Sequence, residues 1–457
     1  GQTCYGLDKL ILNNNYADAT NMKEAVVYDM YQYLDVDASL YNYAKICVNG
    51  DYRGVYLALE AVEDSFMLRN YGTEDGNLYK PESMGVGGGD GEEGKDGGGF
   101  QGGAPQMGNP PENIQMPQSE NDKMPDEFQF SQNGEQSEDI DFSDFKMGAI
   151  GGSGGADLNY TDDDLDSYST IWDGEVTSSG KKDHKRVVEA LKNISEGTDP
   201  EKYMDVDNIL KYMAVHTFVV NDDSLSGTMA HNYYLYEYNG KLNILPWDYN
   251  LSFGGMSMGG GMGGQSSGAT SVINDAIDTP FSITNFFDAL LENEEYLVKY
   301  HEYLNELVEK YVNGGEFQKT YERIRSQINE LVAEDPTAFY SYEEYEAAVE
   351  MLCEVINLRG ESVSGQLDGT IPSTDDGQKA DSSTLIDGSG IELSVMGSMS
   401  MGGGAGEGIG APGGRGDGWQ MRTPGGSVDE QQTGASGKEA GNSDGNEALQ
   451  KTESGGV

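Results

Sequence analysis

The sequence HNYYLYEYNGKLNILPWD, residues 231–248, carries the strongest fold signal in the chain. Two runs rich in tyrosine and aliphatic residues flank Asn239-Gly240, a pair typical of tight hairpin turns because both residues tolerate a positive φ. Pro246 closes the second run, since proline has no amide hydrogen for a strand ladder. The pattern therefore predicts an antiparallel hairpin.

This hairpin brings acidic residues from two segments to one end of the predicted sheet. Asp223 precedes the first strand and Asp248 follows the second, with Asn232 beside them. Such hard oxygen ligands could hold a divalent cation and leave one carboxylate free to orient a hydroxyl. Spacing alone favours the simpler interpretation, in which Asp222, Asp223 and Asp248 belong to solvated turns, and does not settle the choice.

The remaining folded sequence mixes strands and helices. A second hairpin is predicted from residues 43–48 and 52–62 around Asn49-Gly50-Asp51, after an apolar helical pattern over residues 23–34. Residues 77–80 read as a short strand. Further helices are predicted at residues 64–69, 183–195, 206–220 and through most of 280–367. The expected fold class is α+β.

Three glycine-rich stretches with few aliphatic residues interrupt this pattern, at residues 81–158, 254–268 and 368–457. Segments of this composition bury too little apolar area to offset their ordering entropy, so we expect all three to be disordered. Without them, on the order of 270 residues remain for folding. These fall into a small region, residues 1–80, and a larger one, residues 159–367.

The composition excludes some classes of protein. Asp and Glu number 79 against 28 Lys and Arg, a formal net charge of −51, so a nucleic-acid partner held by charge is not expected. Cys4, Cys47 and Cys353 are widely spaced and predict buried thiols. No apolar run reaches the roughly 18 residues of a transmembrane helix. Because the chain starts at Gly1 without a leader, we expect that a leader has been removed.

The segments around the predicted site resemble the CotH family of spore-coat kinases. The family's pattern contains Asn-x-Asp-Ser, His-Asn-Tyr-Tyr-Leu-Tyr and Pro-Trp-Asp-x-Asp-Leu, which correspond here to residues 221–224, 231–236 and 246–251. NGDYRGVYLALE at 49–60 and GNLYK at 76–80 also match, and RGESVSGQL at 359–367 continues the match. The resemblance spans nearly all of the folded residues and omits the glycine-rich stretches.

The resemblance implies an atypical protein-kinase-like fold with two lobes and β-hairpins, whose C-terminal region is helical. Residues 1–80 would form most of the small lobe and residues 159–367 the larger lobe. The implied activity is transfer of the γ-phosphoryl group of ATP to Ser or Thr of a partner protein, with Mg²⁺ or Mn²⁺ as the metal. Positioning and charge neutralisation suffice for this chemistry.

The resemblance also implies a role for each candidate site residue. Asp223 takes the place of the catalytic carboxylate, and Asp248 that of the metal-binding carboxylate, with Asn232 as a second metal contact. Lys80 is the candidate for binding the phosphates of ATP. Glu60 is the candidate acidic residue in the same cleft.

Two positions depart from the family's pattern. The Arg-Gly-Asn-Ser segment usual near the family's N-terminus does not precede Gly1, so we expect the chain to be a fragment. Asn250 stands where the family usually has Asp, which predicts weaker metal binding. A non-catalytic cell-surface or coat protein that keeps the fold is therefore the alternative interpretation. For either interpretation the family implies an extracellular, cell-surface or spore-coat location.

One further acidic motif does not support a metal site. Asp162, Asp164 and Asp166 have the first spacings of a calcium loop, but Ser167 occupies the sixth position, where that loop requires glycine. We interpret this segment as a solvated acidic loop.

Overall fold

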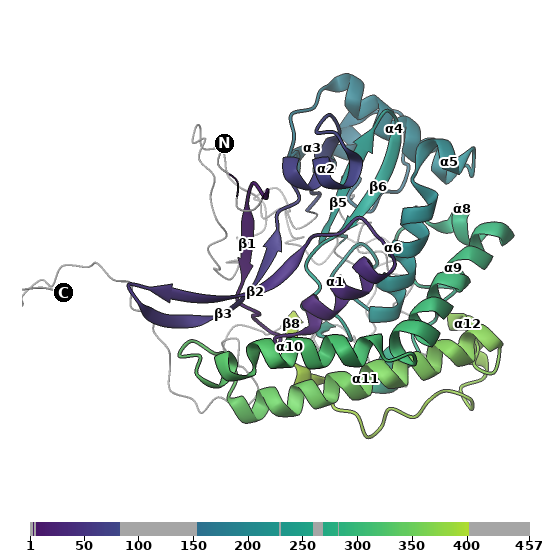
Figure 1. Cartoon of the computed structure of the whole chain (residues 1–457). Helices are drawn as coiled ribbons and strands as arrows, with labels where there is room; N and C mark the ends of the chain where they lie inside the picture. The colour runs from purple at the N-terminus through teal and green to yellow at the C-terminus, as the bar shows by residue number, and fades with distance from the viewer. Residues whose placement is uncertain are drawn as a thin grey trace, which may run out of the picture. The chain divides into compact units, whose positions relative to one another are not determined.

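The computed structural model describes residue 3 and residues 6–82, 153–227, 230–258, 268–281 and 283–401. All of them lie within one compact unit, residues 1–413. The structure is a mixed α+β arrangement with small antiparallel sheets, as predicted (Figure 1). The expected disorder of residues 83–152, 259–267 and 402–457 concerns residues outside the described ranges.

The first sheet contains the hairpin predicted near the N-terminus. β2 (Tyr41–Val48) pairs with β3 (Asp51–Glu60), and Asn49 and Gly50 have φ angles of 53° and 90°, the left-handed conformation that this turn requires. β1 (Leu10–Asn13) pairs with β3, giving the order β1-β3-β2. The inward side chains of β3 join the main core with helix α1 (Lys23–Tyr33).

The second sheet contains the hairpin of the 231–248 segment. β5 (Tyr233–Tyr238) and β6 (Lys241–Pro246) are antiparallel, and Asn239 and Gly240 have φ angles of 55° and 85°. β4 (Asn77–Tyr79) pairs with β5, giving the order β4-β5-β6. A strand from the small N-terminal region thus completes the sheet of the larger region.

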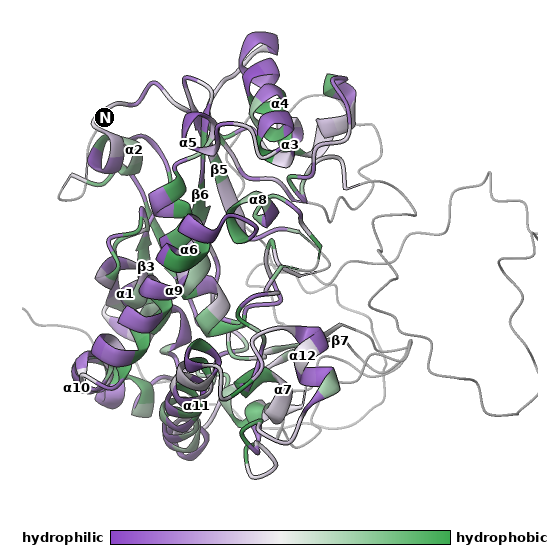
Figure 2. Cartoon of the chain, turned by 90° about the vertical axis from the view of Figure 1, so that its right-hand side faces the viewer, coloured by the Kyte–Doolittle hydropathy of each residue, from purple (hydrophilic) through white to green (hydrophobic). Residues whose placement is uncertain are grey.

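Helices surround this sheet and build most of the core. α6 (Val206–Val219) is the most enclosed, because almost every side chain along it is buried. α9 (Glu294–Glu306) continues into a π-helical turn (Leu307–Val312), followed by α10 (Glu316–Ala333) and α11 (Tyr342–Asp368). Figure 2 shows hydrophilic residues along α4 (Lys181–Ser195) and α10, with hydrophobic residues on the inner elements. Shorter helices are α2 (Asp64–Tyr71), α3 (Ser169–Asp173), α5 (Pro200–Tyr203), α7 (Ala269–Ile273) and α8 (Asp288–Leu291), with a 3₁₀ turn at Leu165–Tyr168.

The segment after α11 differs from the expected disorder as far as residue 401. It forms α12 (Asp375–Ala380), a 3₁₀ turn (Leu393–Met396) and β8 (Met399–Met401), which is parallel to β7 (Met256–Met258). Met396 is fully buried, and Lys23 donates to the carbonyl of Gly397 at 3.1 Å. Composition alone underestimates the order of such a segment, because a few apolar residues can pack on a surface that the rest of the fold supplies.

The structure also describes a few residues at the ends of the other two glycine-rich stretches. Ala156 and Leu158 are buried, and the Tyr233 hydroxyl donates to the carbonyl of Ala156 at 2.6 Å. At the second stretch, β7 lies between Gly255 and the undescribed residues 259–267. Residues 153–158 and 254–258, which were expected to be disordered, are therefore among the described residues.

Two other sequence expectations can be compared with the structure. No helix in the described ranges combines the length and the apolar character that membrane crossing requires. Cys47 is an exposed free thiol and Cys353 a half-buried one, so the prediction of a buried thiol is wrong for Cys47, which lies near the solvent end of β2. Cys4 lies outside the described residues.

Candidate functional site

The ends of three strands bring the candidate residues together. Lys80 directly follows β4, Asn232 directly precedes β5, and Asp248 is two residues beyond β6. In the antiparallel register, Tyr79 is opposite Leu235 and Tyr233 is opposite Pro246. All three candidate residues therefore lie at the same end of the sheet, at the ends of its strands that are far from the Asn239-Gly240 turn.

Asp223 reaches this edge from the loop after α6, and its carboxylate is held by two neighbours. His231 Nε2 lies 2.8 Å from Oδ1, and Asn232 Nδ2 donates to Oδ2 at 3.1 Å. Asn232 Nδ2 also donates to the backbone carbonyl of Asp223 at 2.8 Å. Asp223 is buried, so these contacts fix its orientation and leave the amide oxygen of Asn232 for a ligand.

Asp248 shares the electrostatic environment of the other site residues. Burial and, to a lesser extent, the charge of Asp223 together raise the pKa of its carboxyl to about 6, although Lys80 and His231 oppose the shift. Its backbone is left-handed, with φ of 58°, a strained conformation that clusters at functional sites. Asp223 and Lys80 both lie close enough to Asp248 to act on the charge of its carboxyl, so the structure places these three side chains near one another.

Lys80 is held at its backbone by the loop after α3. Its amide donates to the carbonyl of Gly174 at 2.7 Å, and a Cβ at Gly174 would lie 2.3 Å from the carbonyl oxygen of Lys80. Only glycine permits this approach. The Lys80 ammonium is 2.6 Å from Glu82 and 6.0 Å from the ring centroid of Tyr234, so the Glu82 carboxylate offsets part of its charge.

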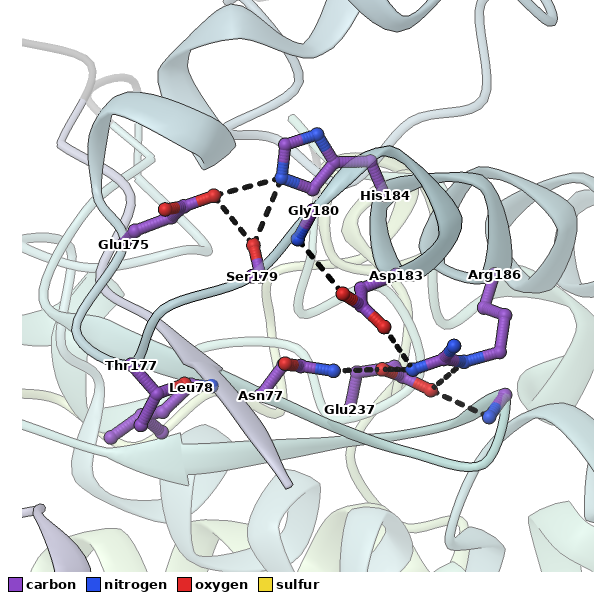
Figure 3. Close-up of polar contacts among 11 residues, drawn as sticks. Asn77, Leu78, Glu175, Thr177, Ser179, Gly180, Asp183, His184, Arg186 and Glu237 are labelled. Atoms are coloured by element: carbon purple, nitrogen blue, oxygen red, sulfur yellow. Dashed lines mark hydrogen bonds and ion pairs between the residues drawn. The ribbon is translucent and has the colours of Figure 1, made fainter. Parts of the chain in front are cut away.

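A network of polar contacts around the buried Glu237 supports this arrangement (Figure 3). Glu237 is fully buried and receives two bonds of 2.8 Å from the Arg186 guanidinium and one of 2.7 Å from Asn77 on β4. His184 lies 2.8 Å from Glu175, which forms a β-bridge with Tyr79. Charge-assisted bonds of this kind fix β4, and therefore Lys80, against β5 and α4.

Glu60 is not brought into this group. It lies on β3 in the first sheet, where its buried carboxylate is 2.5 Å from Arg69 and accepts the amide of Leu40 at 3.2 Å. The contacts of Glu60 therefore join β3 to α2 and to the segment before β2. Asn250, the position of the departure from Asp, donates to the carbonyl of Tyr16 at 3.1 Å.

Two residues near Asp248 were not among the predicted site residues. Glu24, buried at the start of α1, accepts from Asn13 at 2.7 Å and from the amide of Tyr249, and burial followed by the charge of Asp248 raises its pKa strongly. His231, which holds Asp223, has a buried Nδ1 without a partner among the described residues. His231 is next to Asn232 in the matched motif, so the sequence could have indicated a role for it in the site. Nothing in the sequence distinguishes Glu24 from the other residues of its helix.

The donor set fits a cation that arrives with a nucleotide. Within the described ranges, no three His, Cys, Asp or Glu side chains are arranged to hold a metal by themselves. Mg²⁺ commonly takes one or two carboxylates and completes its shell with nucleotide phosphates and water. Asp248 and the amide oxygen of Asn232 are the residues that would supply such a partial set, and Lys80 would add a cation for phosphate.

Comparison with known proteins identifies the family. The family described as CotH kinase protein matches residues 1–363. This match covers most of the 457 residues, and the chain belongs to this family. None of the curated proteins compared with the chain matches it.

Proposed function

We propose that this chain is a protein kinase that transfers the γ-phosphoryl group of ATP to Ser or Thr of a partner protein. The observation that carries the proposal is the oriented, buried Asp223 carboxylate near the half-buried Asp248 and Lys80. Membership of the CotH kinase family supports ATP as the donor and a protein as the acceptor. The β4–β6 sheet with its helices is proposed to correspond to the larger lobe of an atypical kinase-like fold, and β1–β3 with α1 to the smaller lobe.

Each residue has a defined part in the proposed reaction. Bound Mg²⁺ or Mn²⁺ would supply charge neutralisation on the phosphates. Asp248 and Asn232 would hold the metal, and Lys80 would exchange Glu82 for a phosphate oxygen. Asp223 accepts the proton of the acceptor hydroxyl as its oxygen bonds to the γ-phosphorus and the bond to the ADP oxygen breaks. The bonds from His231 and Asn232 keep the Asp223 carboxylate aimed at that hydroxyl.

A non-catalytic surface or coat protein is the second candidate. The observation that favours it is the contact of Asn250 with the Tyr16 carbonyl, because this side chain serves the fold where the family usually has an acidic residue. On either proposal the family points to an extracellular, cell-surface or spore-coat location.

Asp248→Asn separates these candidates through metal binding. Mg²⁺ or Mn²⁺ with ATP should raise the melting temperature of the wild type by mass action, and most of this gain should disappear in Asp248→Asn. Differential scanning fluorimetry with and without each ligand measures the effect. A non-catalytic protein would show no such gain in either variant.

The same variant should behave oppositely without metal. The native pKa of Asp248, about 6, exceeds the ordinary value of 3.8, so the folded state binds the proton more tightly and loses stability as the pH rises through this range. At pH 7 without metal, Asp248→Asn should therefore be more stable than the wild type by about 1–3 kcal/mol. Asp164→Asn, in the exposed acidic loop, is the matched control. A metal gain that vanishes in Asp164→Asn and persists in Asp248→Asn would refute the site.

A further inference from the structure

Buried hydrogen bonds connect the Asp248 segment to two helices. The Tyr31 hydroxyl on α1 lies 2.5 Å from the hydroxyl of Tyr249, the residue after Asp248. The Tyr249 hydroxyl lies 2.9 Å from Nδ1 of His216 on α6. Tyr31, Tyr249 and His216 are all fully or almost fully buried, so water does not compete for these bonds.

The other side of the His216 ring contacts the Asp223 loop. Nε2 lies 2.7 Å from the hydroxyl of Ser226 and 3.2 Å from that of Ser224. Both serine hydroxyls donate to the backbone carbonyl of Asn221, at 3.1 Å and 2.6 Å respectively. Asn221 is two residues before Asp223, so His216 lies between the two segments that carry the carboxylates of the site.

One assignment of protons satisfies all of these bonds. Each hydroxyl has one proton, and when both serine protons go to the Asn221 carbonyl, Nε2 of His216 donates to Ser226. Nδ1 then accepts from Tyr249, which in turn accepts from Tyr31. In the reverse direction the buried Tyr31 proton would have no other acceptor among the described residues. Burial also lowers the pKa of His216 to about 3, consistent with a neutral ring that donates at Nε2.

We propose that His216 is a positioning residue that holds the Asp223 and Asp248 segments at a fixed separation for phosphoryl transfer. The proposal rests on the proposed function for its catalytic consequence. The backbone shows why such a support is needed, because Asp248 and Val220 have φ angles of 58° and 47°, which are costly for residues with a Cβ. A neutral ring with one donor and one acceptor bonds to both segments at once.

Tyr249→Phe tests the proposal because it removes one hydroxyl and keeps the ring. A displacement of about 1 Å in a reacting group can cost about 10²-fold in rate, so kcat should fall by about that factor while KM for ATP changes by less than about threefold. His216→Phe should have a similar effect. The kcat of the double variant should lie within about twofold of that of either single variant, because each single substitution already breaks the same series of bonds.

Tyr300→Phe is the matched control. Tyr300 is also a fully buried tyrosine close to α6, and its hydroxyl donates to the carbonyl of Ile277 at 2.8 Å and contacts the Thr217 hydroxyl at 3.0 Å. Among the described residues, the Tyr300 hydroxyl bonds neither the Asp223 nor the Asp248 segment. Tyr300→Phe should lower the melting temperature about as much as Tyr249→Phe does, because each removes one buried hydroxyl. It should leave kcat within about twofold of the wild type.

Hydrogen exchange measured by mass spectrometry supplies a readout independent of turnover. Tyr249→Phe should speed exchange in peptides covering residues 221–226 and 248–253, and Tyr300→Phe should not. An inactive wild type with this exchange pattern would refute the proposed function and leave His216 as the support of both segments. An active wild type, with kcat and loop exchange in Tyr249→Phe equal to those in Tyr300→Phe, would overturn the positioning role. Multiplicative kcat losses in the double variant would overturn it as well.

Discussion

Asp223→Asn should lower the rate of phosphoryl transfer by about 10³-fold, within the range that a general base contributes. Asparagine keeps the size of the side chain and can still accept from His231, but it cannot take the proton of the acceptor hydroxyl. The initial rate of label transfer from ATP at saturating metal and nucleotide measures the loss.

The neighbouring Asp222 provides the control for this prediction. Asp222 is exposed, whereas Asp223 is buried, so Asp222→Asn should leave the rate within about threefold. Both variants remove one negative charge from the same loop. Equal losses of rate in the two variants would show that the loop acts through its charge. A larger loss of rate in Asp222→Asn would show that Asp222 is the catalytic carboxylate.

Arg359→Met should destabilise the fold by about 3–5 kcal/mol, among the largest effects of a single substitution. The Arg359 side chain is 1% exposed and donates to four backbone carbonyls, those of Thr217, Phe218, Ile273 and Asp275, at 2.7–3.2 Å. Methionine fills similar space but leaves these buried acceptors without their donor, and each costs roughly 1–3 kcal/mol before relaxation. Urea unfolding gives the change in free energy.

Arg323→Met is the comparison for Arg359→Met. Arg323 bonds Asp29 at 2.9 Å, but its side chain is 44% exposed, and exposed ion pairs contribute at most about 1 kcal/mol. Two of the carbonyls that bind Arg359 belong to the last turn of α6, directly before the Asp223 loop. A loss below about 1 kcal/mol in Arg359→Met would mean that water replaces the guanidinium and that α11 does not stabilise this loop.

The local signals in the sequence predict both hairpins and, because a hairpin folds back on itself, that Asp223 and Asp248 lie at the same end of the sheet. An Asn-Gly pair between two strand-like runs determines its own turn, so no distant residue has to be known. The pairing of β4 with β5 follows no such local rule, because the two strands are far apart in sequence. Matching motifs nevertheless placed Lys80 with the hairpin.

The remaining site features depend on tertiary packing. Glu60 lies in a matched motif, but its partner Arg69 on α2 is found only when β3 and α2 are in place. Glu24 belongs to a helix whose apolar pattern predicts only core packing. Its relation to the site is seen only in the folded structure, where the charge of Asp248 raises its pKa. The segment from α12 to β8 has a disorder-like composition and becomes ordered because preformed surfaces accept its few apolar residues.

The most direct test of phosphoryl transfer compares ATP labelled at the γ-phosphate with ATP labelled at the α-phosphate. Both are incubated with the chain, Mg²⁺ or Mn²⁺, and peptides that contain Ser or Thr, beside Asp248→Ala and a sample with metal chelated. We expect γ-label on Ser or Thr in the wild type with metal, none in either comparison, and no α-label in any sample. Incorporation of α-label would indicate nucleotidyl transfer instead, and γ-label that persists in Asp248→Ala, or is absent from the wild type, would contradict the proposed kinase site.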